Sequence, residues 1–335
     1  IATRGRLLQE IESMSKVHVN MAANQVFRQR EGEVAVITGG AGGIGAACAR
    51  EWMAHRGTVV ICDINETMGH EFVANYPGKA RFFKCDTTKR SDLEAAAVLA
   101  KQLGVLTCWM NNAGIAVHES DPLDNFAPIQ KMLDVNITAC TLGTYIAMDN
   151  FDRVRGGVVI TTSSIAGTQA AAFEFPPCYS MSKAANIHFT RCMGKWLQET
   201  SNMRVYALCP GLTQTAIIRD VPTDLTTKWT NIVGGFLTPA HQARGFMMLA
   251  EGDLSNGSVL RVEPRIVMPT NSTTTNTTSN TKSNTLNTSD TTNTIPITTS
   301  NTLNTSSRAI NTGELTAPNN YINNNTTATT TTNTN

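Results

Sequence analysis

Seven short runs of apolar and β-branched residues recur through the middle of this chain, and a longer helical pattern follows nearly every run. The runs cover residues 34–37, 58–62, 81–84, 106–110, 157–162, 204–209 and 258–262. They resemble continuous apolar runs more than an alternation of apolar and polar residues, which is typical of strands that helices cover on both sides. Apolar spacings of three and four predict helices over residues 44–55, 67–75, 92–103, about 124–150, 179–200 and 239–251. The repeat predicts an α/β fold: a Rossmann-type, doubly wound, mostly parallel seven-stranded sheet with helices on both faces.

The composition of the 335-residue chain changes sharply near its C-terminus. Only 16% of the residues are charged, against about 25% in an ordinary soluble domain. Residues 268–335 account for most of the deficit, because they are almost entirely Thr, Asn and Ser and cannot bury enough apolar surface to offset the entropy of ordering. We expect a disordered tail there and one folded domain over residues 33–267. Residues 1–32 are interpreted as a flexible extension, with a transit peptide as the alternative.

Charge and cysteine usage narrow the classes of function. The formal net charge is +1, so we expect no nucleic-acid partner, and the chain has no apolar run long enough for a membrane span. The eight cysteines include no C-x-x-C pair or other metal-ligand spacing, so we expect no metal. Most of them lie among apolar or small neighbours, which indicates buried, reduced thiols and predicts a cytoplasmic protein.

A glycine-rich turn links the first expected strand to the first expected helix. It runs from Thr38 to Gly45 and contains five glycines. Glycines there remove Cβ atoms, so a pyrophosphate can approach the backbone N–H groups and the positive end of the helix. Asp63 ends the next strand about 20 residues later, where a carboxylate bonds an adenosine ribose and repels a 2′-phosphate. An ordinary loop is the alternative, but this context predicts dinucleotide binding, with NAD favoured over NADP.

Further motifs follow the later strands, and as a set they resemble the short-chain dehydrogenase/reductase family. The resemblance covers residues 33–262 and rests on Thr-Gly-x-x-x-Gly-x-Gly, Asn-Asn-Ala-Gly, Tyr-x-x-x-Lys and Pro-Gly. These motifs stand at Thr38–Gly45, Asn111–Gly114, Tyr179–Lys183 and Pro210–Gly211. Short matches near residues 215–217 and 255–258 are similar to NAD-dependent hydroxyprostaglandin dehydrogenase-type members of that family.

The resemblance implies four catalytic residues. Tyr179 is the expected acid and base, and Lys183, one helical turn later, stabilises its phenolate. Ser164, chosen over Ser163, bonds the substrate oxygen, and Asn136 holds a water in the proton path. The plain alternatives are an exposed i, i+4 pair for Tyr179 and Lys183, and a polar residue bonded to backbone for Asn136.

The same resemblance implies a cofactor site formed by many residues. Beside Tyr179 and Lys183, the expected cofactor-binding residues are Thr38, Gly39, Gly43, Ile44, Gly45, Asp63, Asp86, Asn112, Ala113, Gly114, Pro210, Gly211, Thr213 and Thr215. Asp86 and Asn112 follow the third and fourth strands, and Thr213 and Thr215 are expected at the nicotinamide carboxamide.

One departure and one variable segment concern the substrate. Ser164 and Tyr179 are 15 residues apart, a little more than is usual in the family, and the apolar residues 170–177 between them are expected to form a wall of the substrate pocket. Residues 216–237 are expected to be an irregular, mobile and apolar lid, which favours a hydrophobic secondary alcohol or ketone.

The resulting hypothesis is an NAD(H)-dependent oxidoreductase for such a small-molecule substrate, as a homo-dimer or homo-tetramer by analogy with the family. The alternative is a catalytically weak dinucleotide sensor or scaffold of the same fold.

Overall fold

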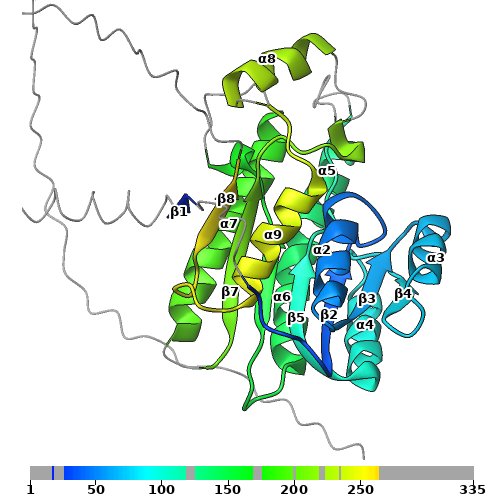
Figure 1. Cartoon of the computed structure of the whole chain (residues 1–335). Coiled ribbons are helices and arrows are strands. Elements are labelled where there is room, and N and C mark those ends of the chain that lie inside the picture. The colour runs from blue at the N-terminus through cyan, green and yellow to red at the C-terminus, as the bar shows by residue number, and fades with distance from the viewer. Residues whose placement is uncertain are drawn as a thin grey trace, which may run out of the picture. The chain divides into compact units, whose positions relative to one another are not determined.

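Parallel strands form a single sheet in the described part of the chain (Figure 1). The computed structural model describes residues 17–18, 26–117, 125–168, 176–198, 201–218, 223–233 and 235–263. All of them belong to the first of two units, Ile1–Thr270. The second unit, Asn271–Asn335, and with it nearly all of the tail expected at 268–335, lies outside the described residues.

The sheet contains the seven expected strands and a short additional one. The strands are β1 (Val17–His18), β2 (Glu33–Thr38), β3 (Thr58–Asp63), β4 (Ala80–Lys84), β5 (Val105–Asn111), β6 (Val158–Thr162), β7 (Arg204–Pro210) and β8 (Val259–Val262). Their order across the sheet is β1-β8-β7-β6-β5-β2-β3-β4, and all seven pairings are parallel. The chain therefore reverses its direction of winding between β2 and β5, which is where such sheets bind ligands.

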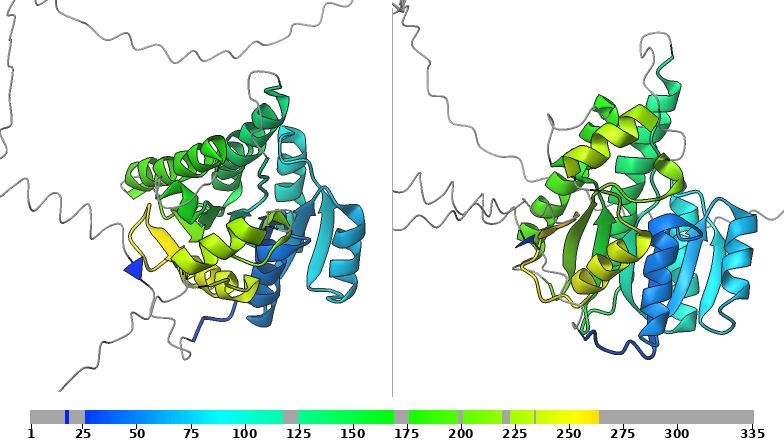
Figure 2. Two further views of the ribbon diagram at one scale, coloured as in Figure 1. Left: turned by 90° about the horizontal axis from the view of Figure 1, so that it is seen from above. Right: turned by 45° about the horizontal axis from the view of Figure 1, so that its top comes forward.

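Helices cover both faces of the sheet, as predicted (Figure 2). On one face lie α2 (Gly43–Ala54), α3 (Glu66–Ala74) and α9 (Pro239–Ala250), and on the other lie α4 (Arg90–Leu103), α6 (Ala139–Asn150) and α7 (Pro177–Gln198). Alternate residues of β2 supply the two cores: Ala35 and Ile37 pack on the side of α2, and Val34 and Val36 on the side of α4. The continuous apolar run in the sequence thus reflects burial of both faces.

Two helical regions differ from the expected pattern. The long helix expected over 124–150 consists of α5 (Ala127–Leu133), the π-helical turn η1 (Asp134–Thr138) and α6, while residues 118–124 lie outside the described part. The expectation of an irregular segment over 216–237 was wrong, because that segment contains the 3₁₀ turn η3 (Ala216–Ile218) and the helix α8 (Thr223–Val233). A second 3₁₀ turn, η2 (Ile165–Gly167), follows β6.

The threonine content of α8 hid this helix from the sequence analysis. Threonine has a low intrinsic helix propensity because of its branched Cβ. In α8 the hydroxyls of Thr226 and Thr227 donate to the carbonyl of Thr223, at 2.9 and 2.7 Å, and Thr230 donates to the carbonyl of Thr226 at 2.7 Å. These bonds satisfy the hydroxyls within the helix itself.

Part of the expected N-terminal extension packs against the domain. Phe27 and Arg30 are buried, with 4% and 1% of their surface exposed. The Arg30 guanidinium lies 4.5 Å from the centroid of the Trp52 ring, and its Nη2 is 2.6 Å from Glu251 Oε1. The packed domain therefore begins before Glu33.

Candidate active site

The expected cofactor residues gather at the carboxyl ends of β2, β3 and β5. The glycine-rich turn leaves β2 and enters α2, and the N-cap residue of this helix, Gly42, has no side chain that could cap it. No acidic residue lies in the first turn of α2, so the positive end of the helix is not neutralised there. This arrangement suits a negatively charged group such as a pyrophosphate.

Two glycines of the turn are required by the geometry. Gly43 has a φ of +52°, in the left-handed region. A Cβ atom on Gly45 would lie 2.7 Å from the Asn112 Nδ2 and in closer contact with the carbonyl oxygen of Gly39. Position 45 therefore has no room for a side chain, and its glycine lets the helix pack closely against the turn and Asn112. With its uncapped helix N-terminus beside it, the turn fits a dinucleotide.

Thr38 and Asn112 fasten the glycine turn to the segment after β5. The Thr38 Oγ1 accepts hydrogen bonds from the N–H groups of Asn112 and Ala113, at 3.0 and 3.1 Å. The Asn112 Nδ2 donates to the carbonyls of Thr38 and Gly39, both at 3.1 Å. The Thr38 hydroxyl therefore bonds within the protein, so it positions the turn more than it offers a contact to a ligand.

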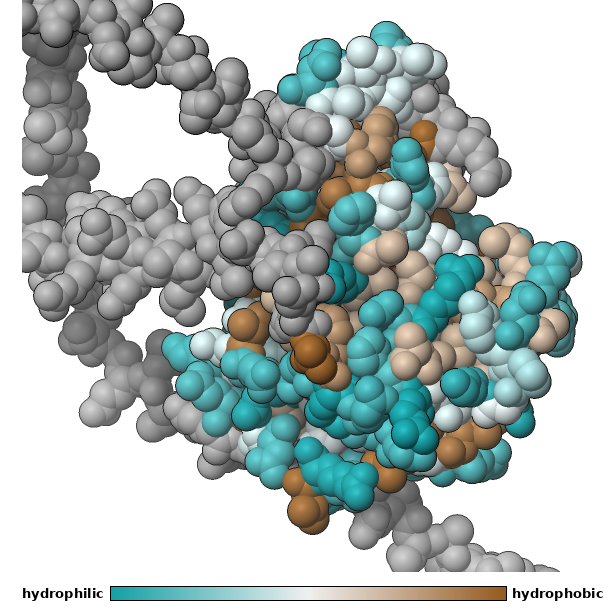
Figure 3. All heavy atoms as spheres, in the orientation of Figure 1, coloured by the Kyte–Doolittle hydropathy of each residue, from teal (hydrophilic) through white to brown (hydrophobic). Residues whose placement is uncertain are grey.

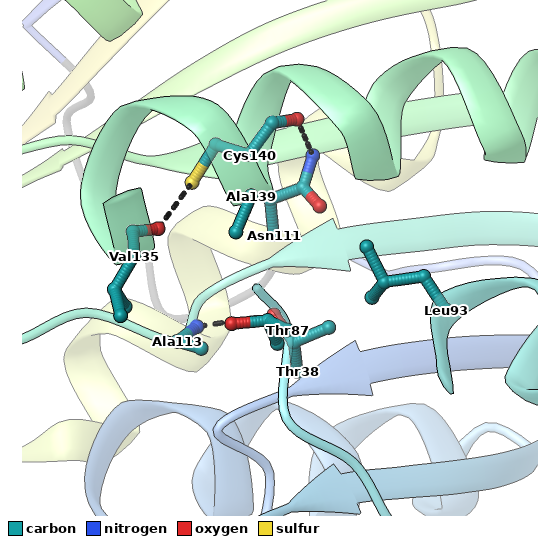
Figure 4. A pocket seen from close by; sticks show the side chains of 8 residues that line it. All are labelled: Thr38, Thr87, Leu93, Asn111, Ala113, Val135, Ala139 and Cys140. Atoms are coloured by element: carbon teal, nitrogen blue, oxygen red, sulfur yellow. Dashed lines mark hydrogen bonds between the residues drawn. The ribbon is translucent and has the colours of Figure 1, made fainter. Parts of the chain in front are cut away.

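A narrow hollow lies beside this junction (Figure 4). It is lined by residues from β2, β5, α4, η1 and α6 and from the segments after β4 and β5: Thr38, Thr87, Leu93, Asn111, Ala113, Val135, Ala139 and Cys140. Figure 4 shows the Ala113 N–H bonded to Thr38 and the Asn111 amide bonded to the carbonyl of Cys140. The hollow marks the point between β2 and β5 where the winding reverses.

Two carboxylates border the cofactor side of the site. Asp63 accepts hydrogen bonds from the N–H groups of Ala41, at 3.1 Å, and Asn65, at 3.0 Å, which fix it next to the glycine turn. Asp86 is half-buried after β4 and accepts a 2.7 Å hydrogen bond from the Thr88 hydroxyl. This bond is the main cause that holds the pKa of the Asp86 carboxyl below its usual range.

Tyr179 and Lys183 lie one turn apart on α7. The Lys183 Nζ is 5.7 Å from the centroid of the Tyr179 ring. Only 4% of Lys183 is exposed, and its Nζ donates to the carbonyl of Thr162 at 3.0 Å. The burial of Lys183 contradicts the alternative of an exposed surface pair.

The adjacent serines after β6 have different partners. The Ser163 hydroxyl donates to the carbonyl of Lys183 at 2.6 Å, so its proton is committed. The Ser164 Oγ accepts from the N–H of Ala166 at 3.1 Å, which leaves its hydroxyl hydrogen for another acceptor. This difference favours Ser164 over Ser163. Of the expected pocket wall at 170–177, residues 170–175 lie outside the described part of the chain.

Asn136 lies in the π-helical turn and is fully buried. Its side chain bonds both the N–H and the carbonyl of Ile115, at 2.9 Å each, and its Nδ2 also lies 3.1 Å from the Ser182 Oγ. Its backbone carbonyl accepts from the Asn186 Nδ2 at 2.9 Å. A Cβ on Gly114 would lie 3.3 Å from both the Asn136 Oδ1 and the Lys183 Nζ, so the two groups converge there. Asn136 thus makes the hydrogen bonds to backbone that its alternative interpretation predicted.

The sequence analysis did not single out Ser182 and Asn186, which share the inner face of α7 with Lys183. Asn186 also bonds the Cys140 thiol. Burial raises the pKa of this thiol to about 11, although Lys183 and Asn186 act to lower it. Polar residues at spacings of three and four around a lysine are the signal that could have identified them.

The segment after β7 brings the remaining cofactor residues to the site. The Gly211 N–H donates to the carbonyl of Val262 at 2.8 Å. The Thr213 hydroxyl donates to the carbonyl of Gly211 at 2.8 Å and is only 5% exposed. Thr215 faces the glycine turn, with its Cγ2 3.3 Å from the Cβ position of Gly43. Thr215 is therefore half-buried beside the turn, whereas the Thr213 side chain is engaged within the protein.

Two further observations concern metal sites and membrane-spanning helices. In the described ranges, no cluster of three or more His, Cys, Asp or Glu side chains could hold a metal ion. Among the same residues, no helix combines the length and apolarity that crossing a membrane requires.

Comparison with known proteins agrees with this geometry. Residues 33–226 match the family described as short chain dehydrogenase. The chain is 29% identical over 252 residues to 15-hydroxyprostaglandin dehydrogenase (NAD(+)) from Bos taurus, across 69% of this chain and 91% of the relative. It is 31% identical over 234 residues to a mitochondrial borneol dehydrogenase from Lavandula x intermedia, across 69% and 88%. A crystal structure of a short-chain type dehydrogenase/reductase from Mycobacterium marinum matches with a TM-score of 0.62 and 25% identity, over 70% of this chain and 95% of the other.

Proposed function

Because the chain belongs to the short-chain dehydrogenase family and is an oxidoreductase, we propose that it transfers hydride between NAD(H) and a hydrophobic secondary alcohol or its ketone. The observation that carries the proposal is the buried Lys183 beside Tyr179, with Ser164 on the neighbouring turn. Burial of a charged ammonium is energetically unfavourable unless a function requires it, and the Lys183 ammonium lies beside the Tyr179 phenol at the edge of the sheet where the cofactor residues gather.

The residues of this chain divide the work of proton transfer and orientation. The glycine turn and Asn112–Gly114 hold the dinucleotide, whose nicotinamide supplies or accepts the hydride. Tyr179 removes the proton of the substrate hydroxyl in the oxidative direction and returns it in the reductive one. Lys183 stabilises the negative charge that develops on the Tyr179 oxygen, and Ser164 donates a hydrogen bond to the substrate oxygen. Asn136 holds a water in the proton path, a role supported by its position: its Oδ1 and the Lys183 Nζ both lie 3.3 Å from the Cβ position of Gly114.

The choice of NAD over NADP rests on Asp63. Its carboxylate is fixed beside the turn by two backbone N–H groups. A negative charge there accepts hydrogen bonds from a ribose and repels a 2′-phosphate. The name of the Bos taurus relative, which specifies NAD(+), supports the same choice.

The class of substrate is inferred from the apolar surface near the site. Ile217, in the turn just after Thr215, is 49% exposed. Figure 3 shows hydrophobic surface beneath α8, on the side of the strands' carboxyl ends. Hydrophobic surface next to the reacting groups favours a substrate with an apolar body.

Assembly and location are part of the proposal. Tyr145 on α6 is 50% exposed and Trp196 on α7 is 57% exposed, and such aromatic side chains are typical of interfaces, which supports a homo-dimer or homo-tetramer. All eight cysteines are free thiols, six of them buried, which supports a reducing compartment such as the cytoplasm. Light scattering of the purified chain and fractionation of cells test these two points.

The central test is Tyr179→Phe, which removes the phenol oxygen and keeps the ring. We expect the turnover of NAD with any accepted hydrophobic secondary alcohol to fall by about 10³-fold, within the usual range for general acid–base catalysis. NADH binding, measured by fluorescence titration, should stay within threefold of the wild type. Tyr76→Phe, whose ring packs against Phe72 just after α3, is the matched control and should leave both quantities unchanged. Turnover within tenfold of the wild type in Tyr179→Phe would contradict the mechanism.

A further inference from the structure

The segment from Gly211 to Thr215 is fastened to the fold on two sides. On one side the Gly211 N–H donates to the carbonyl of Val262, the last residue of β8. On the other, the Gln214 N–H donates to the carbonyl of Leu237 at 2.9 Å, and the Leu237 N–H donates to the carbonyl of Leu212 at 2.8 Å. These bonds fix the backbone of the segment at its edges.

A side chain from α9 contacts the middle of this segment. Gln242 lies on α9 and is completely buried. Its Nε2 donates to the Thr213 Oγ1 at 3.0 Å, and it lies 3.4 Å from the carbonyl oxygen of Val262. The Gln242 amide thus contacts both the Thr213 hydroxyl, which bonds to Gly211, and the Val262 carbonyl, which accepts from the Gly211 N–H.

The orientation of this amide follows from its partners. The Thr213 hydroxyl already donates its hydrogen to the carbonyl of Gly211, so it requires a donor from Gln242, and the Val262 carbonyl can only accept. The Nε2 must therefore face both groups. The Oε1 is then buried and has no hydrogen-bond partner. Leaving a buried acceptor unpaired is unfavourable, so an apolar side chain of the same length would suit the stability of this site better.

We propose that Gln242 is a positioning residue for the dinucleotide: it holds Thr213, and with it the segment 211–215, at the distance from the glycine turn that the nicotinamide half of the coenzyme requires. Thr215 lies at the end of the same segment, with its Cγ2 3.3 Å from the Cβ position of Gly43, so a shift of Thr213 moves Thr215 relative to the glycine turn. The inference rests on the proposed function, because it assigns Gln242 a part in binding the coenzyme of that reaction.

Gln242→Met tests the proposal, since methionine keeps the length of the side chain and removes both its hydrogen bonds and its unpaired oxygen. Gln102→Met, at an exposed position on α4, is the matched control. NADH is titrated by fluorescence against each variant, and thermal unfolding is followed without ligand. We expect the Kd for NADH to rise five- to twentyfold in Gln242→Met while its Tm stays equal to or above that of the wild type. Gln102→Met should match the wild type in both.

If Gln242 only stabilises the fold, Gln242→Met should lower the Tm and leave the Kd for NADH unchanged. That result would overturn the proposal. An unchanged Kd at any Tm would also overturn it. If Gln242→Met does not fold, Thr213→Val removes the same hydrogen bond from the other side, and an unchanged Kd for NADH there has the same meaning. If the wild-type protein binds no NADH, the proposed function itself is wrong. The titration of the wild type therefore distinguishes that outcome from a failure of the Gln242 proposal alone.

Discussion

The two ends of strand β2 are built from different chemistry. At its carboxyl end, Thr38 and the glycine turn present backbone N–H groups and almost no charged side chains. At its amino end, Glu33 accepts hydrogen bonds from Arg28, at 3.0 Å, and from the Thr107 hydroxyl, at 2.9 Å. Arg30, buried on Trp52 and paired with Glu251, lies beside it.

The contrast shows how one strand serves two purposes. A site for a charged, exchangeable ligand needs donors that are already fixed, and backbone groups provide them at no cost in side-chain entropy. At the far end the charged side chains pair with one another, so they are satisfied permanently within the protein. We therefore expect changes at the carboxyl end to affect binding and changes at the amino end to affect stability.

The largest effect is expected from Gly45→Ala. Its Cβ would contact the carbonyl of Gly39 and lie 2.7 Å from the Asn112 Nδ2, and neither group can move without opening the turn. Overpacking of this kind costs about 1–3 kcal/mol, so we expect NADH affinity to fall by at least tenfold in fluorescence titrations.

Gly32→Ala, directly before β2 at its amino end, is the matched control for that change. No heavy atom lies within 4 Å of the position of its Cβ, but its φ of +76° is in the left-handed region, so we expect a cost in stability only. Its Kd for NADH should stay within threefold of the wild type. Equal losses of affinity in Gly32→Ala and Gly45→Ala would show that the close packing of the turn does not support binding.

An intermediate effect is expected from Asp63→Asn, which removes the charge and keeps one oxygen, so that only one of the two N–H groups of Ala41 and Asn65 keeps its acceptor. The preference for NAD over NADP, measured as the ratio of kcat/KM values, should fall by about tenfold, equivalent to about 1.4 kcal/mol, because the 2′-phosphate is no longer repelled. The Tm should fall slightly, because one backbone N–H loses its acceptor. A ratio that does not move would remove Asp63 from cofactor discrimination.

Local signals were sufficient for much of this fold and site. The strands, the glycine turn, Asp63 and the pair of Tyr179 and Lys183 are each encoded within a few neighbouring residues, by apolar runs, missing Cβ atoms or helical spacing. The seven-stranded parallel sheet was predicted from these signals, and the structure confirms it.

What the sequence did not reveal depends on contacts between distant segments. Gln242 is 29 residues from Thr213, and Asn186 is 50 residues from Asn136, so neither partner is visible in the local pattern. The same limit applies to Thr38 and Thr213, which were expected to contact the cofactor: only the structure shows which partners use their hydroxyls. Helix α8 was missed because its threonines have a low intrinsic helix propensity, and only the structure shows that their hydroxyls are satisfied within the helix.

The smallest effect on binding, and the clearest one on stability, is expected at the other end of β2, from Glu33→Gln. Burial alone would raise the pKa of the Glu33 carboxyl, but the hydrogen bonds from Arg28 and Thr107 and the charge of Arg30 outweigh it and hold the pKa below its usual value of 4.5. The unfolded chain therefore binds a proton at higher pH than the folded protein does. The stabilisation is complete above about pH 4.5 and is lost as the pH falls through the lower folded value.

Glu33→Gln should accordingly lower the free energy of unfolding by about 1–3 kcal/mol at pH 7, measured by urea denaturation. The difference from the wild type should shrink as the pH is lowered below 4.5, because the wild-type carboxyl then becomes protonated as well. Glu31→Gln, at an exposed position whose ion pair with Arg56 spans 3.4 Å, is the control and should cost well under 1 kcal/mol. The Kd for NADH should not change in either variant. A loss of NADH affinity in Glu33→Gln would mean that the two ends of β2 are coupled, and the division between a binding end and a stabilising end would fail.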